Sequence, residues 1–331
     1  MKRKTWVVLT AKLTMVEALN IALKQEMAKD SSVIVLGEDV GKDGGVFRVT
    51  DGLWEKFGGE RVIDTPLAES AIIGASIGLA LGGMKPVCEA QFDGFSLPML
   101  DQLISHASRI RWRSRGRFAA HLVLRFPYGG GIRALEHHSD SPEAYYAHTP
   151  GLKVVIPSSP YDAKGLLVSA IRDPDPVVFM EPKRVYRAIR EDVPETEYTV
   201  PIGKANVVQE GSDITLVSWG AMVRECKEAL ALTPYSVELI DLRTISPMDT
   251  KTVIESVKKT GRAVVVQEAP RNCSVSAEVA ATIQKEAFLS LKAPVKRVTG
   301  FDTVIPFARM EGFYIADEKR IAKEIEKVMK F

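Results

Sequence analysis

Short apolar runs alternate with amphipathic stretches along most of the chain. Residues 14–27 begin with a Thr14/Glu17 capping pattern and then repeat apolar side chains at helical spacing, which predicts a helix. Runs rich in β-branched residues follow, separated by helical stretches, at 33–37, 61–65, 85–92, 121–126, 153–157 and 176–181. This alternation predicts a mostly parallel sheet with helices on both faces.

The alternation stops once and then begins again. Residues 188–211 are rich in charge and proline and show no sustained hydrophobic period, so we expect a linker there. Apolar runs and amphipathic helices resume afterwards and end in a helix whose Ile321, Ile325 and Val328 share one face. We therefore predict an α/β fold with two domains, divided as an N-terminal extension at 1–12, a first domain at 13–187, the linker, and a second, smaller domain at 212–331.

Composition is that of an ordinary globular protein and excludes few functions. The 331 residues are enough for two domains, and a formal net charge of +2 gives no global field that would mark a nucleic-acid binder. The longest apolar run, 71–83, is shorter than the roughly 20 residues that span a bilayer. Three cysteines are far apart and match no metal-ligand spacing. We expect a cytoplasmic protein with no membrane segment and no nucleic-acid partner.

The helix predicted after the segment DTPLAES has two notable features. Gly74, Gly78 and Gly82 recur every four residues and therefore share one face, where another backbone can approach closely. That neighbour belongs either to the same chain or to another subunit. Glu69 stands at the start of the helix, where the helix dipole favours a carboxylate. It either caps the helix or, set in an apolar wall, shares a proton with a bound heterocycle.

Two loops after predicted strands carry further candidates. QFDGF at 91–95 places an amide and two rings at a strand end, the usual ligand face of an open α/β sheet, although core packing explains either ring as well. The glycine- and proline-rich segment 129–151 holds the adjacent His137 and His138, a favourable setting for catalysis. The arginine-rich RIRWRSRGR at 109–117 predicts an ion-paired surface or a subunit contact rather than a nucleic-acid site.

Several long segments, in order along the chain, resemble one family. They are GEDVGKDGGVFRVTDGLWEKFG, RVIDTPLAES, HHSDSPEAYYAHTPGLKVVIPSSPYDAKGLLVSAIRDPDPVVFMEP, DLRTISPMD and KTGRAVVVQEAP. Together they are similar to the β subunit of the thiamine-diphosphate-dependent 2-oxo acid dehydrogenases, from about residue 13 to the C-terminus. The resemblance implies a transketolase-like pyrimidine-binding domain followed by a transketolase C-terminal domain.

The resemblance also implies roles for single residues. Glu69 matches the glutamate that hydrogen-bonds the aminopyrimidine ring of thiamine diphosphate and favours its imino tautomer. Leu67 and Gln91 match positions that line the pocket, and Phe95 matches the aromatic ring that lies against the aminopyrimidine. His138, which its HS context favours over His137, matches the loop histidine that assists acyl transfer to a lipoyl group.

A potassium site is a further implication of the resemblance. Some members of the family hold a structural potassium ion at the positions that correspond to Leu122, Val123, Asp173 and Asp175. A turn that ends a helix explains the two aspartates equally well.

The expected partners follow from a missing motif. Thiamine enzymes of this class bind the diphosphate through Mg²⁺ held by a segment that begins with GDG and ends with NN, and this chain contains neither. The resemblance therefore implies an α subunit that supplies the Mg²⁺ ligands, in an α₂β₂ heterotetramer. It also implies a lipoyl acyltransferase core that accepts the acyl group.

The expected substrate is a 2-oxo acid, and two kinds of segment favour different ones. SPEAYYAH resembles branched-chain enzymes, whereas SSPYDAKGLLVSAIRDPDP and YTVPIGKA resemble bacterial pyruvate enzymes. We take a branched-chain 2-oxo acid as the expected substrate and pyruvate as the alternative. A subunit of a split transketolase-type enzyme and a noncatalytic assembly subunit are the remaining alternatives.

Overall fold

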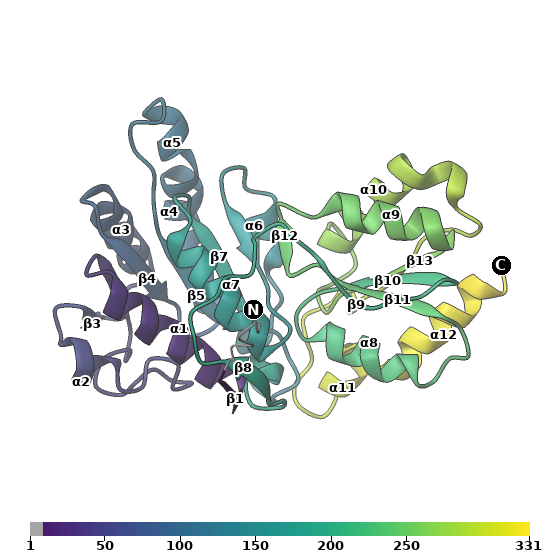
Figure 1. Cartoon of the computed structure of the whole chain (residues 1–331), viewed down its shortest axis with the longest axis horizontal. Helices are drawn as coiled ribbons and strands as arrows, with labels where there is room; N and C mark the ends of the chain where they lie inside the picture. The colour runs from purple at the N-terminus through teal and green to yellow at the C-terminus, as the bar shows by residue number, and fades with distance from the viewer. Residues whose placement is uncertain (1–8) are drawn as a thin grey trace, which may run out of the picture.

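The computed structural model describes residues 9–331, which form two α/β domains side by side (Figure 1). The first domain runs from purple to teal in the figure, and the second from green to yellow. Most of the predicted N-terminal extension, residues 1–8, lies outside the described residues. The predicted fold class, two α/β domains with largely parallel sheets, is confirmed.

The first domain is built on a seven-stranded sheet with the order β12-β6-β7-β5-β4-β2-β3. All neighbouring pairs are parallel except β12 with β6. Its central strands are buried on both faces, as expected for a parallel sheet covered by helices. The strands are β2 (Val33–Gly37), β3 (Val62–Asp64), β4 (Lys85–Glu89), β5 (Val123–Tyr128), β6 (Lys153–Val155), β7 (Val177–Pro182) and β12 (Thr244–Ser246).

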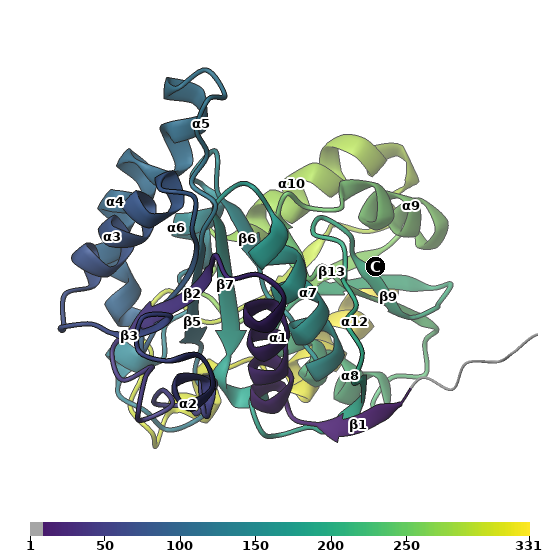
Figure 2. The same cartoon turned by 60° about the vertical axis from the view of Figure 1, so that its left-hand side comes forward.

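Helices cover both faces of this sheet (Figure 2). α1 (Met15–Lys29) and α7 (Pro160–Arg172) pack together on one face, while α3 (Glu69–Leu81) and α4 (Leu100–Ser105) lie on the other. The predicted capping box of Thr14 and Glu17 starts α1, and the apolar stripe of that helix is buried. Shorter helices complete the domain: α2 (Leu53–Phe57), α5 (Ile110–Arg113) and α6 (Glu143–Ala147).

The second domain has a five-stranded sheet with the order β14-β13-β10-β11-β9, antiparallel only at β9. Figure 1 shows α9 and α10 on one face of this sheet and α8 and α12 on the other. The strands are β9 (Asn206–Gln209), β10 (Ile214–Ser218), β11 (Val237–Asp241), β13 (Ala263–Val266) and β14 (Lys296–Val298). The helices are α8 (Met222–Leu230), α9 (Thr250–Thr260), α10 (Val275–Ala287), α11 (Glu311–Tyr314) and α12 (Glu318–Met329).

The segment predicted as a linker is more ordered than its sequence indicated. It contains β8 (Glu191–Pro194), which pairs antiparallel with β1 (Thr10–Leu13), and it also contains β9, which joins the second sheet. Only Val193 of β8 is fully buried, so the strand has no apolar face that a hydrophobic period could reveal. The absence of a period in residues 188–211 therefore did not mean an absence of strands.

The two domains share a hydrophobic core as well as a chain connection. Tyr128 and Ile156 of the first domain belong to the same buried cluster as Trp219 and Ile240 of the second. The chain also crosses back, because β12 follows β11 of the second sheet but pairs with β6 of the first. Full burial of a large apolar side chain contributes about 1.5–3 kcal/mol, so this shared core fixes the second domain against the first.

Candidate active site

The carboxyl ends of the parallel strands gather most of the predicted site residues at one edge of the first sheet. Because β2, β3, β4, β5 and β7 run in the same direction, the loops that follow them meet at this edge. Those loops carry Glu38 and Asp39, Leu67 and Glu69, Gln91 to Phe95, His137 and His138, and Lys183. The fold therefore brings three strand ends to the same edge, those of β3, β4 and β5, which carry the predicted residues Leu67, Glu69, Gln91, Phe95 and His138.

Glu69 is the first residue of α3 and is half-buried. Ala68 occupies the N-cap position and cannot supply a side-chain cap, so Glu69 lies where the positive end of the helix dipole favours a carboxylate. Leu67, in the turn before the helix, is 79% exposed. This placement agrees with both interpretations of Glu69: an acid that stabilises the first turn of the helix, and a carboxylate that faces a ligand.

Glu38 is a second acid at this edge, which the sequence reasoning did not single out. It follows the buried strand β2 and is only 8% exposed. Burial raises the pKa of Glu38, and the negative charge of Glu69 raises it further. Its Oε1 is buried and has no hydrogen-bond partner among residues 9–331. In the sequence, Glu38 could have been recognised as a charged residue directly after a fully apolar strand.

Gln91 connects two of the loops. Its Nε2 donates a hydrogen bond of 2.8 Å to Oδ2 of Asp39, which follows β2, while Gln91 itself follows β4. Asp39 adopts a left-handed conformation, with φ of 57°, that only a minority of non-glycine residues adopt. The hydrogen bond therefore holds a strained turn in place beside Glu38.

The aromatic rings of the site form one continuous cluster. His138 stacks on Phe92 with ring centroids 4.1 Å apart and an interplanar angle of 18°. Phe95 meets His138 edge-on at 5.2 Å, and Phe47 meets Phe92 edge-on at 5.4 Å. Both Phe92 and Phe95 are half-buried, so their rings are partly available to a ligand rather than lost in the core.

The two adjacent histidines differ in their surroundings. His137 is exposed and packs against Gly94, where a Cβ would collide with the carbonyl oxygen of His137. His138 is half-buried, and its Nδ1 has no hydrogen-bond partner in the described part of the chain. A buried ring nitrogen without a partner is available to bind or to exchange a proton with a ligand.

A buried ion-pair network lies beneath the same strand ends. The guanidinium of Arg125 donates to Glu181 at 2.8 and 2.7 Å and also to Glu89. Tyr186 donates its hydroxyl to Glu181. Burial raises the pKa of Glu89, against the opposite effect of Arg125. Because Glu89, Arg125 and Glu181 belong to β4, β5 and β7, the network fixes these strands relative to one another.

The residues of the predicted potassium site lie elsewhere. Asp173 accepts hydrogen bonds of 2.6 and 2.7 Å from Nζ of Lys153, and Asp175 accepts one of 2.5 Å from Nε of Arg111. The carbonyl oxygens of Leu122 and Val123 accept from Val177 N and Cys88 Sγ. These groups surround the amino ends of the strands, away from Glu69, and Lys153 already neutralises part of the aspartate charge.

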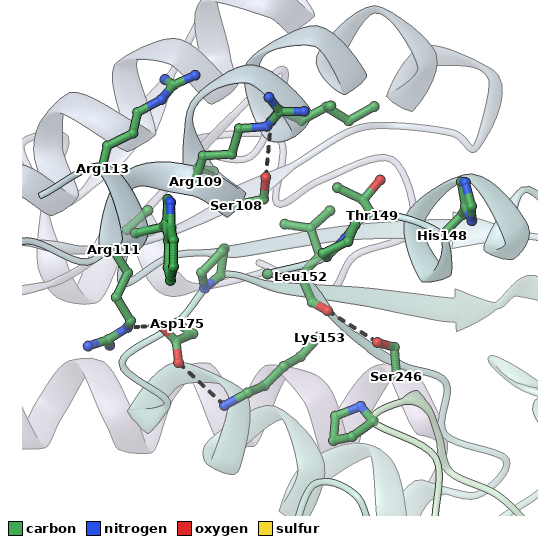
Figure 3. A pocket seen from close by; sticks show the side chains of 18 of the residues that line it. Ser108, Arg109, Arg111, Arg113, His148, Thr149, Leu152, Lys153, Asp175 and Ser246 are labelled. Carbon is green, nitrogen blue, oxygen red and sulfur yellow. Dashed lines mark hydrogen bonds and ion pairs between the residues drawn. The ribbon is translucent and has the colours of Figure 1, made fainter. Parts of the chain in front are cut away.

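A hollow of about 1410 Å³ also opens on this amino-terminal side (Figure 3). Its wall includes the arginine-rich segment 109–117, which extends away from the sheet around α5 (Figures 1 and 2). Arg111, Asp175 and Lys153 form a row of ion pairs along it (Figure 3). Trp112 is 88% exposed. Part of the predicted ion-paired surface is thus present. The hollow is distinct from the site around Glu69, because the hollow lies at the amino ends of the strands and Glu69 lies at their carboxyl ends.

Within residues 9–331, no helix is long and apolar enough to cross a membrane.

Sequence models of two families match the chain. The one described as "Transketolase, pyrimidine binding domain" matches residues 11–188, and the one described as "Transketolase, C-terminal domain" matches residues 203–321. These matches correspond to the two α/β domains of the structure.

Curated relatives cover nearly the whole chain. The pyruvate dehydrogenase E1 component subunit beta of Acholeplasma laidlawii is 53% identical over 321 residues, which make up 96% of this chain and 98% of the relative. Proteins of the same name from Staphylococcus epidermidis and Staphylococcus aureus are 52% and 51% identical over 324 residues, 97% of this chain and 100% of each relative.

A solved structure shares the fold at lower sequence similarity. It is titled "Split gene transketolase, inactive beta4 tetramer", and it matches 97% of this chain and 99% of its own with a TM-score of 0.79. At 19% identity, this match supports the fold alone.

Proposed function

Because the chain belongs to the transketolase-like, thiamine-diphosphate-dependent family, as a β subunit of the 2-oxo acid dehydrogenases, we propose that it supplies the pyrimidine-binding half of a site shared with an α subunit. The observation that carries the proposal is the gathering of Glu69, Gln91, Phe95 and His138 at one sheet edge. The chain also has no segment that begins with GDG and ends with NN to hold the diphosphate through Mg²⁺.

The residues present at this edge fit a flat, nitrogen-rich heterocycle. Half-buried rings offer faces against which such a ring can lie, and the carboxylate of Glu69 is partly accessible. One buried polar atom at this edge, Glu38 Oε1, has no hydrogen-bond partner among residues 9–331 and is available to the ring. When bound, thiamine diphosphate supplies a nucleophilic thiazolium carbon and a sink for the electrons released by decarboxylation.

Five residues of the chain have roles in the proposed reaction. Glu69 holds a proton at its carboxylate and exchanges it with the aminopyrimidine nitrogen. Leu67, Gln91 and Phe95 line the binding position and orient the ring, Gln91 through its fixed hydrogen bond to Asp39. His138, on the loop after β5, moves a proton during acyl transfer. The Mg²⁺ ligands come from the α subunit.

The proposed substrate is pyruvate, not the branched-chain 2-oxo acid that we expected from SPEAYYAH. Relatives that are 51–53% identical over nearly the whole chain are named for pyruvate. Such identity over full length outweighs one short segment. In the proposed reaction, the bond between the carboxylate and the carbonyl carbon of pyruvate breaks and carbon dioxide leaves. The acetyl group forms a thioester with one sulfur of lipoyllysine, while the lipoyl disulfide is reduced and its other sulfur takes a proton.

The proposed heterotetramer has support from the surface of α3. Ala71, Ala75, Gly78 and Gly82 lie on one exposed face of this helix, directly beyond Glu69. A Cβ added at Gly78 would have no neighbour within 4 Å in the described chain, and one at Gly74 would meet only the side chain of Gln102. The glycine face is therefore not used for a close crossing with another backbone of this chain. We propose that it packs against the α subunit in an α₂β₂ assembly, with a lipoyl acyltransferase as the further partner.

The potassium site stays a proposal at the amino ends of the strands. Asp173 and Asp175 would keep their present partners, Lys153 and Arg111, or exchange them for the ion. Leu122 and Val123 would contribute carbonyl oxygens.

A turnover panel tests the proposed function. The chain is co-expressed with its α subunit and assayed with pyruvate, 2-oxobutyrate and the branched-chain 2-oxo acids, with free lipoamide as acceptor. We expect the highest kcat/KM for pyruvate. A higher value for a branched-chain acid would overturn the substrate assignment, and activity only with an aldose phosphate as acceptor would instead support the transketolase-type alternative. Absence of bound thiamine diphosphate from the purified complex would support a noncatalytic assembly subunit.

A further inference from the structure

Asp93 and Lys183 form a fully buried ion pair directly below the histidine loop. Nζ of Lys183 lies 2.5 Å from Oδ1 of Asp93, and both side chains have 0% exposure. Asp93 follows β4 and Lys183 follows β7, so the pair joins two strand ends of the candidate site. Asp93 lies within the candidate segment 91–95, but neither residue is among the individual site residues predicted from the sequence.

The remaining hydrogen bonds of the pair go to the main chain on both sides of Ser139. Lys183 Nζ donates a second bond of 2.5 Å to the carbonyl oxygen of His138. Oδ2 of Asp93 accepts a bond of 2.7 Å from the backbone N–H of Asp140. The pair therefore fixes the main chain immediately before and after Ser139, next to the His138 ring.

The same lysine also lies close to the ring against which His138 packs. Its ammonium group is 5.5 Å from the centroid of Phe92, and Phe92 stacks on His138 at 4.1 Å. Movement of Lys183 would thus disturb both the main chain and the ring contact of His138.

Burial changes the pKa of both side chains of the pair. It raises the pKa of Asp93 to about 6, and it lowers the pKa of Lys183, in each case against the favourable effect of the partner. Both charged forms are therefore disfavoured by their surroundings. A buried ion pair is often replaceable by apolar residues without loss of stability, so stability alone does not explain its presence here.

The other end of the loop is held by the second domain. Glu268 accepts a hydrogen bond from Gly130 N, and Glu311 accepts bonds of 2.6 and 3.1 Å from Gly131 N and Arg133 N. Gly130, Gly131 and Arg133 are thus tied to the second domain, whereas residues 138–140 are tied to Asp93 and Lys183. Gly129 N also donates a bond of 2.8 Å to the carbonyl oxygen of Asp140, so the two ends of the loop are joined. The bonds to Glu268 and Glu311 do not involve the ion pair, so comparing the two ends distinguishes a local effect of the pair from a general loosening of the loop.

We propose that Asp93 and Lys183 are positioning residues that fix the main chain at His138 and Asp140 and so hold the imidazole over Phe92 for acyl transfer. This inference rests on the proposed function of His138. Neither Asp93 nor Lys183 needs to touch the substrate in this role.

The test uses the complete α/β complex with Lys183→Met, which keeps the length of the side chain but removes its donors. Lys85→Met is the matched control, because Lys85 pairs with Asp30 at 2.8 Å at the amino end of β4, remote from the loop. Two activities are compared: decarboxylation of pyruvate with ferricyanide as electron acceptor, and acetyl transfer to a lipoyl domain. Hydrogen–deuterium exchange of peptides from 129–134 and 135–141 is followed by mass spectrometry.

We expect Lys183→Met to lower acetyl transfer by roughly tenfold to a hundredfold while the ferricyanide activity falls by less than about threefold. Exchange in 135–141 should rise by about tenfold or more, with a much smaller rise in 129–134, whose bonds to Glu268 and Glu311 remain. Adding Lys183→Met to His138→Ala should cause no further loss of transfer, because a positioning residue acts only through the residue that it positions. Lys85→Met should match the wild-type protein in every assay.

Different results would contradict the positioning role of the ion pair and the proposed function of His138. Unchanged exchange in 135–141, or an equal fall of both activities, would overturn the positioning role even if His138→Ala abolishes acetyl transfer. If His138→Ala leaves transfer intact, the proposed function of His138 fails and the positioning role fails with it. Should Lys183→Met not assemble, the double variant Asp93→Asn/Lys183→Met removes both charges and keeps an acceptor for Asp140 N–H. The same split of activities is then expected, and its absence overturns the proposal.

Discussion

The imidazole of His138 lies almost flat on the ring of Phe92, with centroids 4.1 Å apart and planes inclined by 18°. This contact holds a histidine from the loop after β5 against a phenylalanine from the loop after β4. It gives His138 a stacked partner ring, whereas the exposed His137 meets Phe95 only edge-on, with centroids 5.4 Å apart. The two histidines should therefore respond differently to mutation.

His138→Ala should lower acyl transfer to a lipoyl acceptor by the roughly 10²–10⁴-fold typical of losing a general acid–base group. Binding of thiamine diphosphate to the α/β complex should be unchanged, since His138 serves transfer rather than binding. His137→Ala should lose far less activity, because its ring is exposed. Steady-state assays of both variants check this, and the reverse ranking would show that His137 has the role given to His138.

Gly78→Leu should prevent assembly with the α subunit without harming the fold of the chain. Gly78 is exposed in α3 with no neighbour within 4 Å of an added Cβ in the described chain, and leucine at a helix position adds about 0.5–1 kcal/mol of stability over glycine. Co-purification of the two subunits and a melting curve of the β chain are the measurements. Gly312→Leu, at another exposed helical glycine without near neighbours, is the control. Normal assembly of Gly78→Leu would contradict the proposed use of this helix face.

The strands and long helices could be predicted because their burial follows their sequence period. β2, β5 and β7 are apolar runs buried on both faces, and Thr14, Glu17 and the stripe of α1 behave as their spacing indicates. β1, β8, β9 and β12 could not be predicted in this way. They are three or four residues long, and each contains residues that remain partly exposed. Their pairing depends on segments far away in the sequence, which local patterning does not encode.

Glu143→Gln should change the dependence of stability on pH. Burial, with a smaller contribution from the charge of Glu268, raises the pKa of Glu143 from its ordinary 4.5 to about 8. The folded state then binds a proton that the unfolded state has lost, so stability falls by up to about 1.4 kcal/mol per pH unit as pH rises between these values. Glutamine does not ionise, and the loss should disappear.

Thermal melts at pH 5, 6.5 and 8 measure this effect. The variant should gain on the wild-type protein as pH rises, and a constant difference across the three values would contradict the buried, proton-binding state of Glu143. Glu255→Gln is the control, because the side chain of Glu255 is 67% exposed.

Part of the candidate site was visible in the sequence, and the supporting residues were not. Glu69, Gln91 and His138 stand out through the ends of predicted strands and through a motif-level resemblance. Asp93 and Lys183 are 90 positions apart, and in the sequence a lysine next to an arginine is typical of a solvated surface. Only the parallel order of β4, β5 and β7 brings such residues together beneath the loop.

The isolated chain should neither bind thiamine diphosphate tightly nor decarboxylate pyruvate. A doubly charged diphosphate requires a bound cation, and this chain lacks the segment that holds Mg²⁺ in enzymes of this class. Calorimetry with cofactor and Mg²⁺ should show micromolar binding only after the α subunit is added. Tight binding to the chain alone would refute the shared site.

The chemistry proposed for the site depends on Glu69 sharing a proton with the aminopyrimidine of the cofactor. The most direct measurement is hydrogen–deuterium exchange at the thiazolium carbon of cofactor bound to the α/β complex, with Glu69→Gln compared with wild type and a melting curve beside it. We predict that exchange slows by about 10²–10⁴-fold while the melting point is held, because glutamine is isosteric but cannot give or take the proton. If Glu69 only stabilises the start of α3, the substitution should cost a few tenths to about 1 kcal/mol of stability and leave exchange unchanged, and that result would contradict the account.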